Sequence, residues 1–188
     1  MSLTPSTMMP LGTKAPDFRL HDTVSLKTLS LSDCSSSIAT VILFICNHCP
    51  YVQHIQSELS LLSNEYSDKG VRFIAINAND VNAFPEDSPE KMTRFAQKNN
   101  FNFPYLYDPT QEVAKAYQAA CTPDFYIFDK NLLCAYRGRF DASTPGNGLA
   151  VTGEDLRNAL KHICANQAVD TKQHPSLGCN IKWKTPIN

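Results

Sequence analysis

The sequence predicts an α/β fold in which a central mixed sheet is flanked by helices. Two apolar, β-branched runs at residues 38–45 and 71–78 are typical of buried central strands, because they do not alternate with polar residues. Segments with helical spacing separate the strands. Two strands at 124–129 and 132–137, joined by a polar turn and followed by a helix, close the pattern. Alternating strands and helices that end in a hairpin and a helix indicate a mixed sheet with helices on both faces.

The first half of the chain begins with short strands and continues into a long helix. Residues 15–20 and 24–31 alternate enough to predict an N-terminal strand pair. After the buried run at 38–45, a helix is expected to begin at Pro50, because apolar side chains then recur every three or four residues. Gly70 is expected to end this helix, since glycine is common just past a helix C-terminus.

The second half of the chain begins with a polar segment, 79–87, that we expect to be a loop. Ser88 and Pro89 then predict a helix to about residue 99, with serine as the N-cap and proline at the first helical position. The later elements follow from capping signals and apolar runs: a strand at 104–107, a helix that starts at 108–111 and runs through 120, strands at 124–129 and 132–137, and a helix at 153–166 capped by Thr152.

A chain of 188 residues is long enough for one domain with its own core. We expect a domain at residues 12–166, preceded by an N-terminal extension at 1–11. A polar, proline-containing C-terminal tail at 167–188 is expected to pack on the domain.

The overall charge and the cysteine content exclude several classes of protein. A net charge of −1 gives no reason to expect a nucleic acid or an acidic membrane surface as a partner. The longest apolar run, 38–46, is too short to span a bilayer, and residues 1–13 lack the pattern of a secretory signal. We therefore expect a cytoplasmic protein with reduced thiols. Seven cysteines, an odd number and mostly scattered, also argue against a structural disulfide framework.

The most informative segment is the CNHC motif at residues 46–49, which lies between the first buried strand and the long helix. The start of a helix offers unpaired N–H groups and a positive dipole end, both of which favour a thiolate. The two-residue spacer lets Cys46 and Cys49 form a disulfide, and an imidazolium at His48 favours the thiolate further. The alternative is that both cysteines only fill space in the core.

A second group of residues, Cys121-Thr122-Pro123-Asp124, stands just before a predicted strand. An ordinary trans proline at a strand start is the alternative for such a sequence. In this position, after the CxxC unit, a further strand and a helix, the group resembles the thioredoxin-like superfamily, which places a cis-proline loop beside the CxxC. The resemblance implies that Pro123 is that proline and that the Thr122 backbone binds a peptide or partner. It also implies that Cys121 lies near the site, although a packing role fits this residue equally well.

Several other segments narrow the resemblance to the peroxiredoxin branch, which contains the alkyl hydroperoxide reductase and thiol-specific antioxidant proteins. These are residues 12–18, the insertion at 79–90, and 105–108. Four further segments resemble a peroxiredoxin-like group of redoxins, and this resemblance covers nearly the whole chain. The segments are residues 47–52, 121–125, 136–141 and 178–183.

Two departures from these families bear on the chemistry. Peroxiredoxins place their peroxidatic cysteine where Cys49 falls, with a threonine three residues before it, and that position is Cys46 here. The change removes a hydroxyl that positions peroxide and supplies a disulfide partner instead. Thioredoxins also place a buried acid at the position of Thr40, and the proton acceptor here is expected to be Asp124 or an acid within 79–90.

We therefore expect a thiol–disulfide oxidoreductase in which Cys46 attacks and Cys49 resolves the mixed disulfide. The expected substrates are protein or small-molecule disulfides, with a thioredoxin or glutathione system as reductant, and no cofactor or bound metal is expected. One alternative is a thiol peroxidase that reduces hydroperoxides with Cys49 as the peroxidatic residue. Another is a protein that holds a soft metal such as copper with Cys46, His48 and Cys49. The sequence does not predict the oligomeric state.

The remaining candidates lie in the last third of the chain. Arg137 and Arg139 flank a glycine at a strand end, where they stabilise a thiolate, bind an anionic partner or are simply solvated. Cys179 lies in the tail with Trp183, and it is expected either as a third redox thiol or as a spectator beside a packed tryptophan. The other three cysteines are expected to be structural or incidental: Cys34, Cys134 and Cys164.

Overall fold

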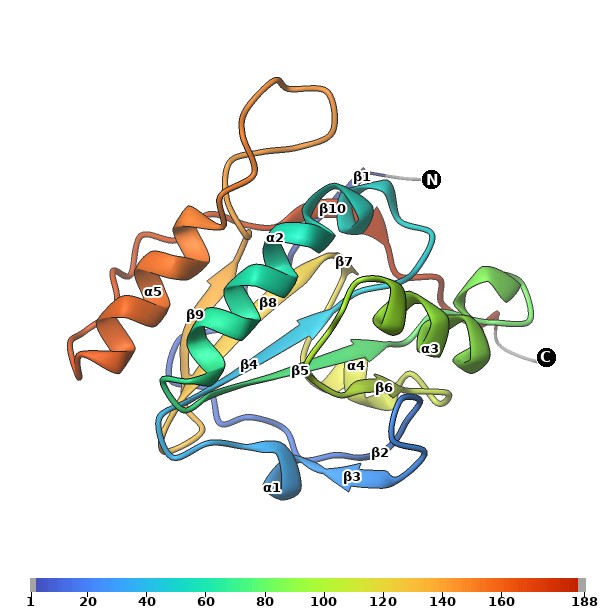
Figure 1. Cartoon of the computed structure of the whole chain (residues 1–188), viewed down its shortest axis with the longest axis horizontal. Coiled ribbons are helices and arrows are strands. Elements are labelled where there is room, and N and C mark those ends of the chain that lie inside the picture. The colour runs from blue at the N-terminus through green and yellow to red at the C-terminus, as the bar shows by residue number, and fades with distance from the viewer. Residues whose placement is uncertain (1–2, 186–188) are drawn as a thin grey trace.

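The computed structural model describes residues 3–185 and contains a seven-stranded mixed sheet with the order β3-β2-β6-β5-β4-β8-β9 (Figure 1). Within it, β4, β5 and β6 are parallel, and the remaining neighbours pair antiparallel. The strands are β2 (Arg19–Asp22), β3 (Thr28–Ser30), β4 (Ala39–Phe44), β5 (Val71–Asn77), β6 (Tyr105–Tyr107), β8 (Asp124–Asp129) and β9 (Cys134–Gly138). The predicted mixed sheet is confirmed.

Helices cover both faces of this sheet. The helices are α1 (Leu31–Cys34), α2 (Pro50–Ser67), α3 (Pro89–Lys98), α4 (Glu112–Ala116) and α5 (Glu154–Cys164), with a 3₁₀ turn, η1, at Pro85–Asp87. The long helices α2 and α5 lie side by side in front of the sheet in Figure 1, and α3 packs on the same core. Residues of α1 and α4 belong to the core on the opposite face.

The position of β4 explains why its sequence is apolar throughout. It pairs with β5 on one side and β8 on the other, so every residue of the strand is buried. Val41 and Leu43 point into the core beneath α2, while Ile42 and Phe44 point into the core on the other face. Strand β4 therefore delivers the chain that follows it into the middle of the molecule.

Two predicted helices are shorter in the structure. The helix expected from 108 through 120 is only α4, because Gln111 (φ 65°) and Gln118 (φ 55°) are both left-handed. The Asp108 carboxylate instead accepts hydrogen bonds from the backbone N–H groups of Gln111 and Ala114, both at 2.9 Å. The last helix is capped by Gly153 rather than Thr152, since Gly153 (φ 65°) has the non-helical backbone that precedes the first helical residue.

A second, three-stranded sheet was not predicted. It has the order β1-β10-β7 and consists of β1 (Leu3–Pro5), β10 (Leu177–Asn180) and β7 (Cys121–Thr122). Both ends of the chain thus contribute strands, whereas the sequence predicted only a tail that packs on the domain. The division at residues 11 and 166 stays a prediction, and residues 1–2 and 186–188 of the two end segments lie outside the described residues.

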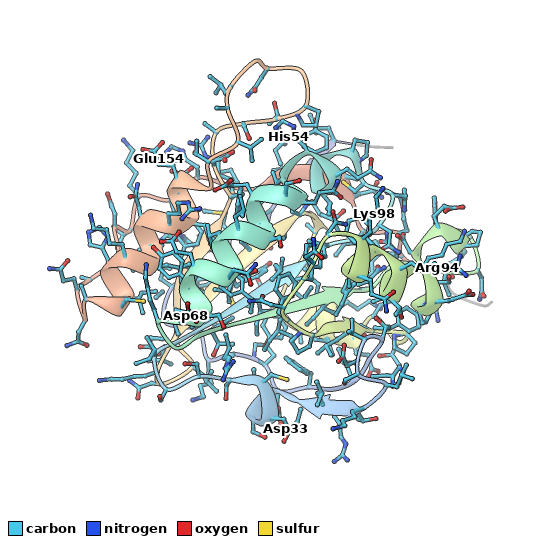
Figure 2. The ribbon with its side chains drawn as sticks, in the orientation of Figure 1. Asp33, His54, Asp68, Arg94, Lys98 and Glu154 are labelled. Atoms are coloured by element: carbon cyan, nitrogen blue, oxygen red, sulfur yellow. The ribbon has the colours of Figure 1, made fainter. Side chains whose placement is uncertain are left out.

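The acidic and basic side chains labelled in Figure 2 lie on several different elements of the fold. Asp68 follows α2, Arg94 and Lys98 belong to α3, and Glu154 begins α5. Within residues 3–185, no helix combines the length and the apolar character needed to cross a membrane.

Candidate active site

The CNHC motif occupies the loop between β4 and α2. Cys49 is the N-cap residue of α2, and its carbonyl oxygen accepts hydrogen bonds from the N–H groups of Val52 and Gln53, both at 3.0 Å. Cys46 lies in the loop and its thiol is hydrogen-bonded to Cys49. Both cysteines are buried, at 1% and 0% exposure. The sequence thus correctly placed the pair at the start of a helix.

Thr122 and Pro123 lie against these two sulfur atoms. The peptide bond between them is cis, as the resemblance implied. The Thr122 hydroxyl Oγ1 is 3.4 Å from the Cys46 sulfur, and the Thr122 carbonyl oxygen is 3.1 Å from the Cys49 sulfur. This carbonyl accepts the proton of Cys49 when Cys49 is a thiol, so it favours the thiol form. The hydroxyl can donate and therefore has the opposite effect on a nearby thiolate.

A buried acid, Asp87, organises the other side of the motif. Its Oδ1 accepts a hydrogen bond from the Asn47 N–H at 2.8 Å, and its Oδ2 accepts one from the Asn79 amide at 2.7 Å. Oδ2 also lies 2.7 Å from His48 Nδ1, and the His48 ring stacks on Phe84 with 5.6 Å between the centroids. The hydrogen bond that His48 donates to the Asp87 carboxylate raises the pKa of His48 above its usual value.

Of the two proton acceptors expected from the sequence, the loop acid is the one at the motif. Asp87 lies within the segment 79–90, and its negative charge acts on Cys46. Asp124 instead hydrogen-bonds to the Tyr126 hydroxyl at 3.0 Å, and the Tyr126 ring belongs to the core on the opposite face of the sheet from Cys46. Burial raises the pKa of Asp124 to about 7.

The two thiols of the motif have opposite pKa shifts. The hydrogen bond from the Cys46 thiol lowers the pKa of Cys49 to about 5, with further bonds from Thr122 and Cys179 that together outweigh burial. The positive end of α2 acts in the same direction. The pKa of Cys46 is raised well above its usual value, because Cys46 donates to Cys49, is buried, and lies near the negative charge of Asp87. The donors around Cys49 therefore favour a thiolate on Cys49 over one on Cys46.

The tail strand β10 covers the edge of β7. Cys179 pairs with Thr122, and Asn180 pairs with Cys121, both antiparallel. The approach is close at Gly178, where an added Cβ would stand 2.1 Å from the Thr122 carbonyl oxygen. The resemblance implied that the Thr122 backbone binds a peptide or partner, but in this structure the chain's own tail occupies that edge.

The tail is anchored differently from the sequence expectation. Trp183 is 41% exposed, whereas Cys179 and Ile181 are buried, so these two residues rather than the tryptophan fix the tail. Cys179 lies in the same apolar cluster as Cys46 and Cys49. Its thiol donates a hydrogen bond to the Cys49 sulfur.

The other predicted site residues have structural contacts of their own. The Cys121 thiol is 3.7 Å from the Pro123 carbonyl oxygen, and burial raises the pKa of Cys121. Arg137 donates to the Met9 carbonyl oxygen at 2.8 Å and to Gln173, so it holds the two end segments rather than a thiolate. Arg139 forms an ion pair of 2.6 Å with Asp155.

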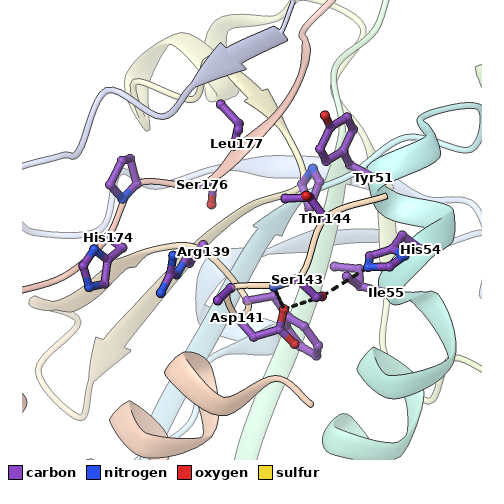
Figure 3. A pocket seen from close by; sticks show the side chains of 14 residues that line it. Tyr51, His54, Ile55, Arg139, Asp141, Ser143, Thr144, His174, Ser176 and Leu177 are labelled. Atoms are coloured by element: carbon purple, nitrogen blue, oxygen red, sulfur yellow. Dashed lines mark hydrogen bonds between the residues drawn. The ribbon is translucent and has the colours of Figure 1, made fainter. Parts of the chain in front are cut away.

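A cavity of about 240 Å³ lies beside the cis-proline (Figure 3). In Figure 3, Tyr51 and His54 of α2 face it from one side, and Leu177 of the tail faces it from another. Ser143 links His54 (3.2 Å) to Asp141 (2.5 Å) on its wall. The complete lining is Tyr51, His54, Ile55, Pro123, Arg139–Thr144 and His174–Leu177. The cavity adjoins the motif through Tyr51, two residues after Cys49, and through Pro123.

Three side chains at the motif bring metal-ligating atoms together. The ligand atoms of Cys46, His48 and Asp87 lie within 4.8 Å of one another. The sequence had grouped Cys49 with Cys46 and His48 instead. A thiolate, an imidazole and a carboxylate form a donor set that suits zinc or copper. His48 Nε2 is buried and has no hydrogen-bond partner within residues 3–185.

Comparisons with known proteins bear on the family and the fold of the chain. The AhpC/TSA family profile matches residues 11–137. An uncharacterized conserved protein from Geobacillus kaustophilus is 55% identical, with a TM-score of 0.98 over 100% of this chain and 99% of that chain. The search of curated proteins found no similar sequence.

More distant solved structures share the fold. A putative thiol:disulfide interchange protein DsbE from Chlorobium tepidum is 19% identical, with a TM-score of 0.63 over 83% of this chain and 99% of that chain. The peroxidoxin BcpB from Mycobacterium tuberculosis is 17% identical, with a TM-score of 0.61 over 85% and 99%. At these identities the likeness concerns the fold alone, and it confirms the expected thioredoxin-like fold.

Proposed function

The chain belongs to the AhpC/TSA family, and on that premise we propose that it is a thiol–disulfide oxidoreductase that cycles Cys46 and Cys49 between dithiol and disulfide. One observation carries this proposal. Cys49, at the start of α2, receives a hydrogen bond from a second thiol, Cys46, and this bond favours the thiolate form of Cys49. The order of attack is the reverse of the one expected from the sequence, because the electrostatics favour Cys49 as the nucleophile.

In the reductive direction, the Cys49 thiolate attacks one sulfur of a substrate disulfide. A bond forms between Cys49 and that sulfur, the substrate S–S bond breaks, and the other half leaves as a thiolate. Cys46 then attacks Cys49, which closes the Cys46–Cys49 disulfide and releases the second half of the substrate. One thioredoxin dithiol, or two molecules of glutathione, then reduces the Cys46–Cys49 disulfide and leaves as the corresponding disulfide, which restores the starting state.

The surroundings of Cys46 explain why it acts second. Its thiol is held protonated chiefly by the hydrogen bond to the Cys49 thiolate. Once Cys49 carries the substrate, that negative charge is gone, and the pKa of Cys46 falls. His48, with its pKa raised by Asp87 and its Nε2 without a partner in the described chain, is suited to protonate a leaving thiolate.

The burial of both cysteines favours a small disulfide over a folded protein as the substrate. β10 lies along the edge of β7, where an extended peptide would otherwise pair. The cavity beside Pro123 and Tyr51 is lined by both apolar and polar side chains, and it could hold the part of a small disulfide that does not react. We also propose that the protein acts in a reducing compartment such as the cytoplasm, because its seven cysteines are all thiols in the structure.

The order of attack is tested by single-turnover reaction with an aromatic disulfide that releases a coloured thiol. Cys34 and Cys164, which are half-buried, are first replaced by serine to remove background reaction. Cys46→Ser should keep the fast first release, and Cys49→Ser should lose it. Fast release in Cys49→Ser with loss in Cys46→Ser would overturn the proposed order, and fast release in both would overturn the proposed function.

Peroxide reduction is a second candidate, favoured by the low pKa of Cys49. A thiolate at a helix start is the nucleophile that a hydroperoxide requires, and Cys46 would resolve the resulting sulfenic acid. Stopped-flow mixing with micromolar hydroperoxide separates the two candidates. Rapid loss of the Cys49 thiolate would assign peroxidase activity, while loss only with disulfides would support the first proposal.

Soft-metal binding is a third candidate, favoured by the cluster of Cys46, His48 and Asp87. Metal analysis of protein purified under reducing conditions tests it. Stoichiometric zinc or copper that disappears in Asp87→Ala would support this candidate, and metal-free protein with full disulfide-exchange activity would exclude it.

A further inference from the structure

The cavity beside the cis-proline has walls from distant parts of the chain (Figure 3). Arg139 directly follows β9, and its backbone N–H donates a hydrogen bond to the His174 carbonyl oxygen at 3.0 Å. The two segments approach closely at Gly138, where an added Cβ would lie 2.2 Å from that oxygen. Arg139 and His174 therefore face the cavity together, while Tyr51 and His54 of α2 face it from the other side.

The side chains of these walls offer more hydrogen-bond donors than the protein itself uses. The Arg139 guanidinium donates through Nε to Asp155 at 2.6 Å, and its two terminal amino groups have no hydrogen-bond partner within residues 3–185. The hydroxyl groups of Tyr51 and Thr144 and the ring of His174 also have none in the described part of the chain. A ligand in this cavity would therefore meet free donors, and a guanidinium can only donate.

The carboxylate in the lining, Asp141, has its oxygens occupied by the protein. Oδ1 accepts hydrogen bonds from the N–H and the hydroxyl of Ser143, at 2.8 and 2.5 Å. Oδ2 accepts from the N–H groups of Thr152 and Gly153, both at 2.7 Å. A ligand that completes the hydrogen bonds of this cavity must therefore supply acceptors of its own.

The rest of the lining is largely apolar, and the cavity is small. Its volume of about 240 Å³ lies below the range of about 300–1,000 Å³ that is usual for drug-sized ligands. The apolar side chains include those of Ile55, Pro123, Phe140 and Leu177. An aromatic ring or a short aliphatic chain fits this space better than a peptide does.

We propose that this cavity binds a carboxylate carried on a small apolar group, and that the substrates are small disulfides with such a carboxylate. The assignment to disulfides rests on the proposed function. Arg139 is the binding residue, because its planar fork of donors matches the two oxygens of a carboxylate. Its ion pair with Asp155 through Nε holds the fork in place. Arg137, the other arginine that the sequence offered for an anionic partner, holds the end segments instead.

The position of the cavity suits such a substrate. It adjoins the motif through Tyr51, two residues after Cys49, and through Pro123. The carbonyl oxygen of Thr122, the residue before Pro123, is 3.1 Å from the Cys49 sulfur. A disulfide attached directly to a group in the cavity therefore lies next to the two cysteines of the motif. Binding in the cavity requires no particular charge on either thiol.

Binding is tested without any reaction by NMR titration of the whole chain with benzoate and with benzamide, its neutral isostere. Benzoate should shift the backbone amide signals of Tyr51, Ser143 and His174 saturably. It should bind about tenfold or more tightly than benzamide, because only benzoate makes charge-assisted hydrogen bonds. In Arg139→Gln the two affinities should become equal.

Substrate preference is tested with two disulfides that release coloured thiols, one made of two nitrobenzoates and one of the matching nitrobenzamides. Each kcat/KM, measured in the Cys34→Ser/Cys164→Ser background, is divided by the rate of the same disulfide with glutathione, which removes differences in intrinsic reactivity. The corrected ratio should favour the nitrobenzoate disulfide. Arg139→Gln should lower this ratio about tenfold or more.

Two further variants separate the carboxylate site from general disturbance. Ala142→Asp adds a negative charge at an exposed position of the lining and removes no side-chain hydrogen bond, so it should lower the same ratio even if Arg139→Gln does not fold. The matched control is Arg157→Gln, which removes the same charge from α5. Arg157 pairs with Glu58 and Glu65 outside the lining, so the ratio should not change.

The outcomes distinguish this proposal from the proposed function. Equal affinities for benzoate and benzamide in the wild type would overturn the carboxylate site and leave disulfide exchange intact. Benzoate binding that depends on Arg139, without a preference for the nitrobenzoate disulfide, would overturn the substrate class. No exchange with either disulfide would overturn the proposed function itself, while the benzoate titration would still decide whether the cavity binds carboxylates.

Discussion

Cys49 at the start of α2 and Cys134 in β9 are equally buried, at 0% and 2% exposure, yet their acidities differ greatly. Burial raises the pKa of Cys134 to about 11, as expected of a thiol in an apolar core. Cys49 has a pKa of about 5, because thiol and hydroxyl donors converge on it at a helix N-terminus. Burial alone makes a cysteine inert, and the hydrogen-bond donors around the sulfur make it reactive.

Substitutions at Cys49 and Cys134 should differ most in their effect on the rate of disulfide exchange. Cys49→Ser should slow single-turnover disulfide exchange on the order of a thousandfold or more, because it removes the nucleophile itself. Cys134→Ser should leave the rate unchanged, since the Cys134 thiol bonds to the Tyr136 carbonyl oxygen at 3.5 Å and lies in the core on the opposite face of the sheet from Cys49. Equal losses in both variants would show that general disturbance of the core, and not the thiolate, limits the reaction.

The pH dependence of stability should also separate the two thiols. A thiol whose folded pKa lies below its unfolded pKa stabilises the fold fully above the unfolded value, near 8.5, and loses this contribution as pH falls towards the folded value of about 5. The free energy of unfolding of the wild type minus that of Cys49→Ala should therefore increase from pH 5 to pH 8. The slope should be at most about 1.4 kcal/mol per pH unit.

Urea unfolding at a series of pH values measures this difference. For Cys134→Ala the same difference should stay flat between pH 5 and pH 8, because Cys134 is neutral in both states over that range. A flat profile for Cys49→Ala would contradict a low pKa for Cys49.

The donors of Cys49 can be removed one at a time. A hydrogen bond to a charged group contributes about 1.5–3 kcal/mol, so Cys46→Ala should raise the pKa of Cys49 and lower its thiolate fraction about tenfold in weakly acidic solution. Cys179→Ala should have the same direction and a smaller effect, because Cys46 makes the largest contribution. Thiolate absorbance near 240 nm, followed against pH, measures the pKa of Cys49 in each variant. A larger rise of this pKa in Cys179→Ala than in Cys46→Ala would contradict the expected order.

The smallest expected effect concerns His48. Asp87→Asn removes the negative charge 2.7 Å from His48 Nδ1, so the raised pKa of His48 should return towards its usual value. NMR titration of the His48 ring protons measures this change. His54 provides an internal reference, since it bonds to Ser143 rather than to Asp87. An unchanged His48 titration would mean that Asp87 does not control this ring.

Local signals in the sequence located much of the site. The apolar run of β4 and the helical spacing after Pro50 are patterns within short stretches of chain, whereas the cis-proline before β8 was implied by the resemblance to the thioredoxin-like superfamily. The two local patterns were enough to predict a strand, a helix and two cysteines at their junction.

The parts that sequence reasoning missed depend on contacts between distant segments. Asp87 reaches the motif from a loop 40 positions beyond Asn47, and only the expectation of an acid within 79–90 pointed to it. Strand β10 has four residues and no apolar alternation, so its pairing with β7 is decided by tertiary contacts alone. For the same reason, the sequence assigned the attacking role to Cys46, whereas we propose this role for Cys49, on which the hydrogen bonds from Cys46 and Cys179 converge.

Near neutral pH, Cys49 should be a thiolate, whereas the other buried cysteines should be thiols. The most direct test of this difference is the rate of alkylation of each cysteine in the wild-type protein by iodoacetamide from pH 4 to pH 10, followed by peptide mass spectrometry. Cys49 alkylation should rise through a midpoint near pH 5, while Cys46 and Cys134 should stay unmodified up to pH 8. A midpoint for Cys49 near the ordinary thiol value of about 8.5, or an earlier midpoint for Cys46, would contradict this difference.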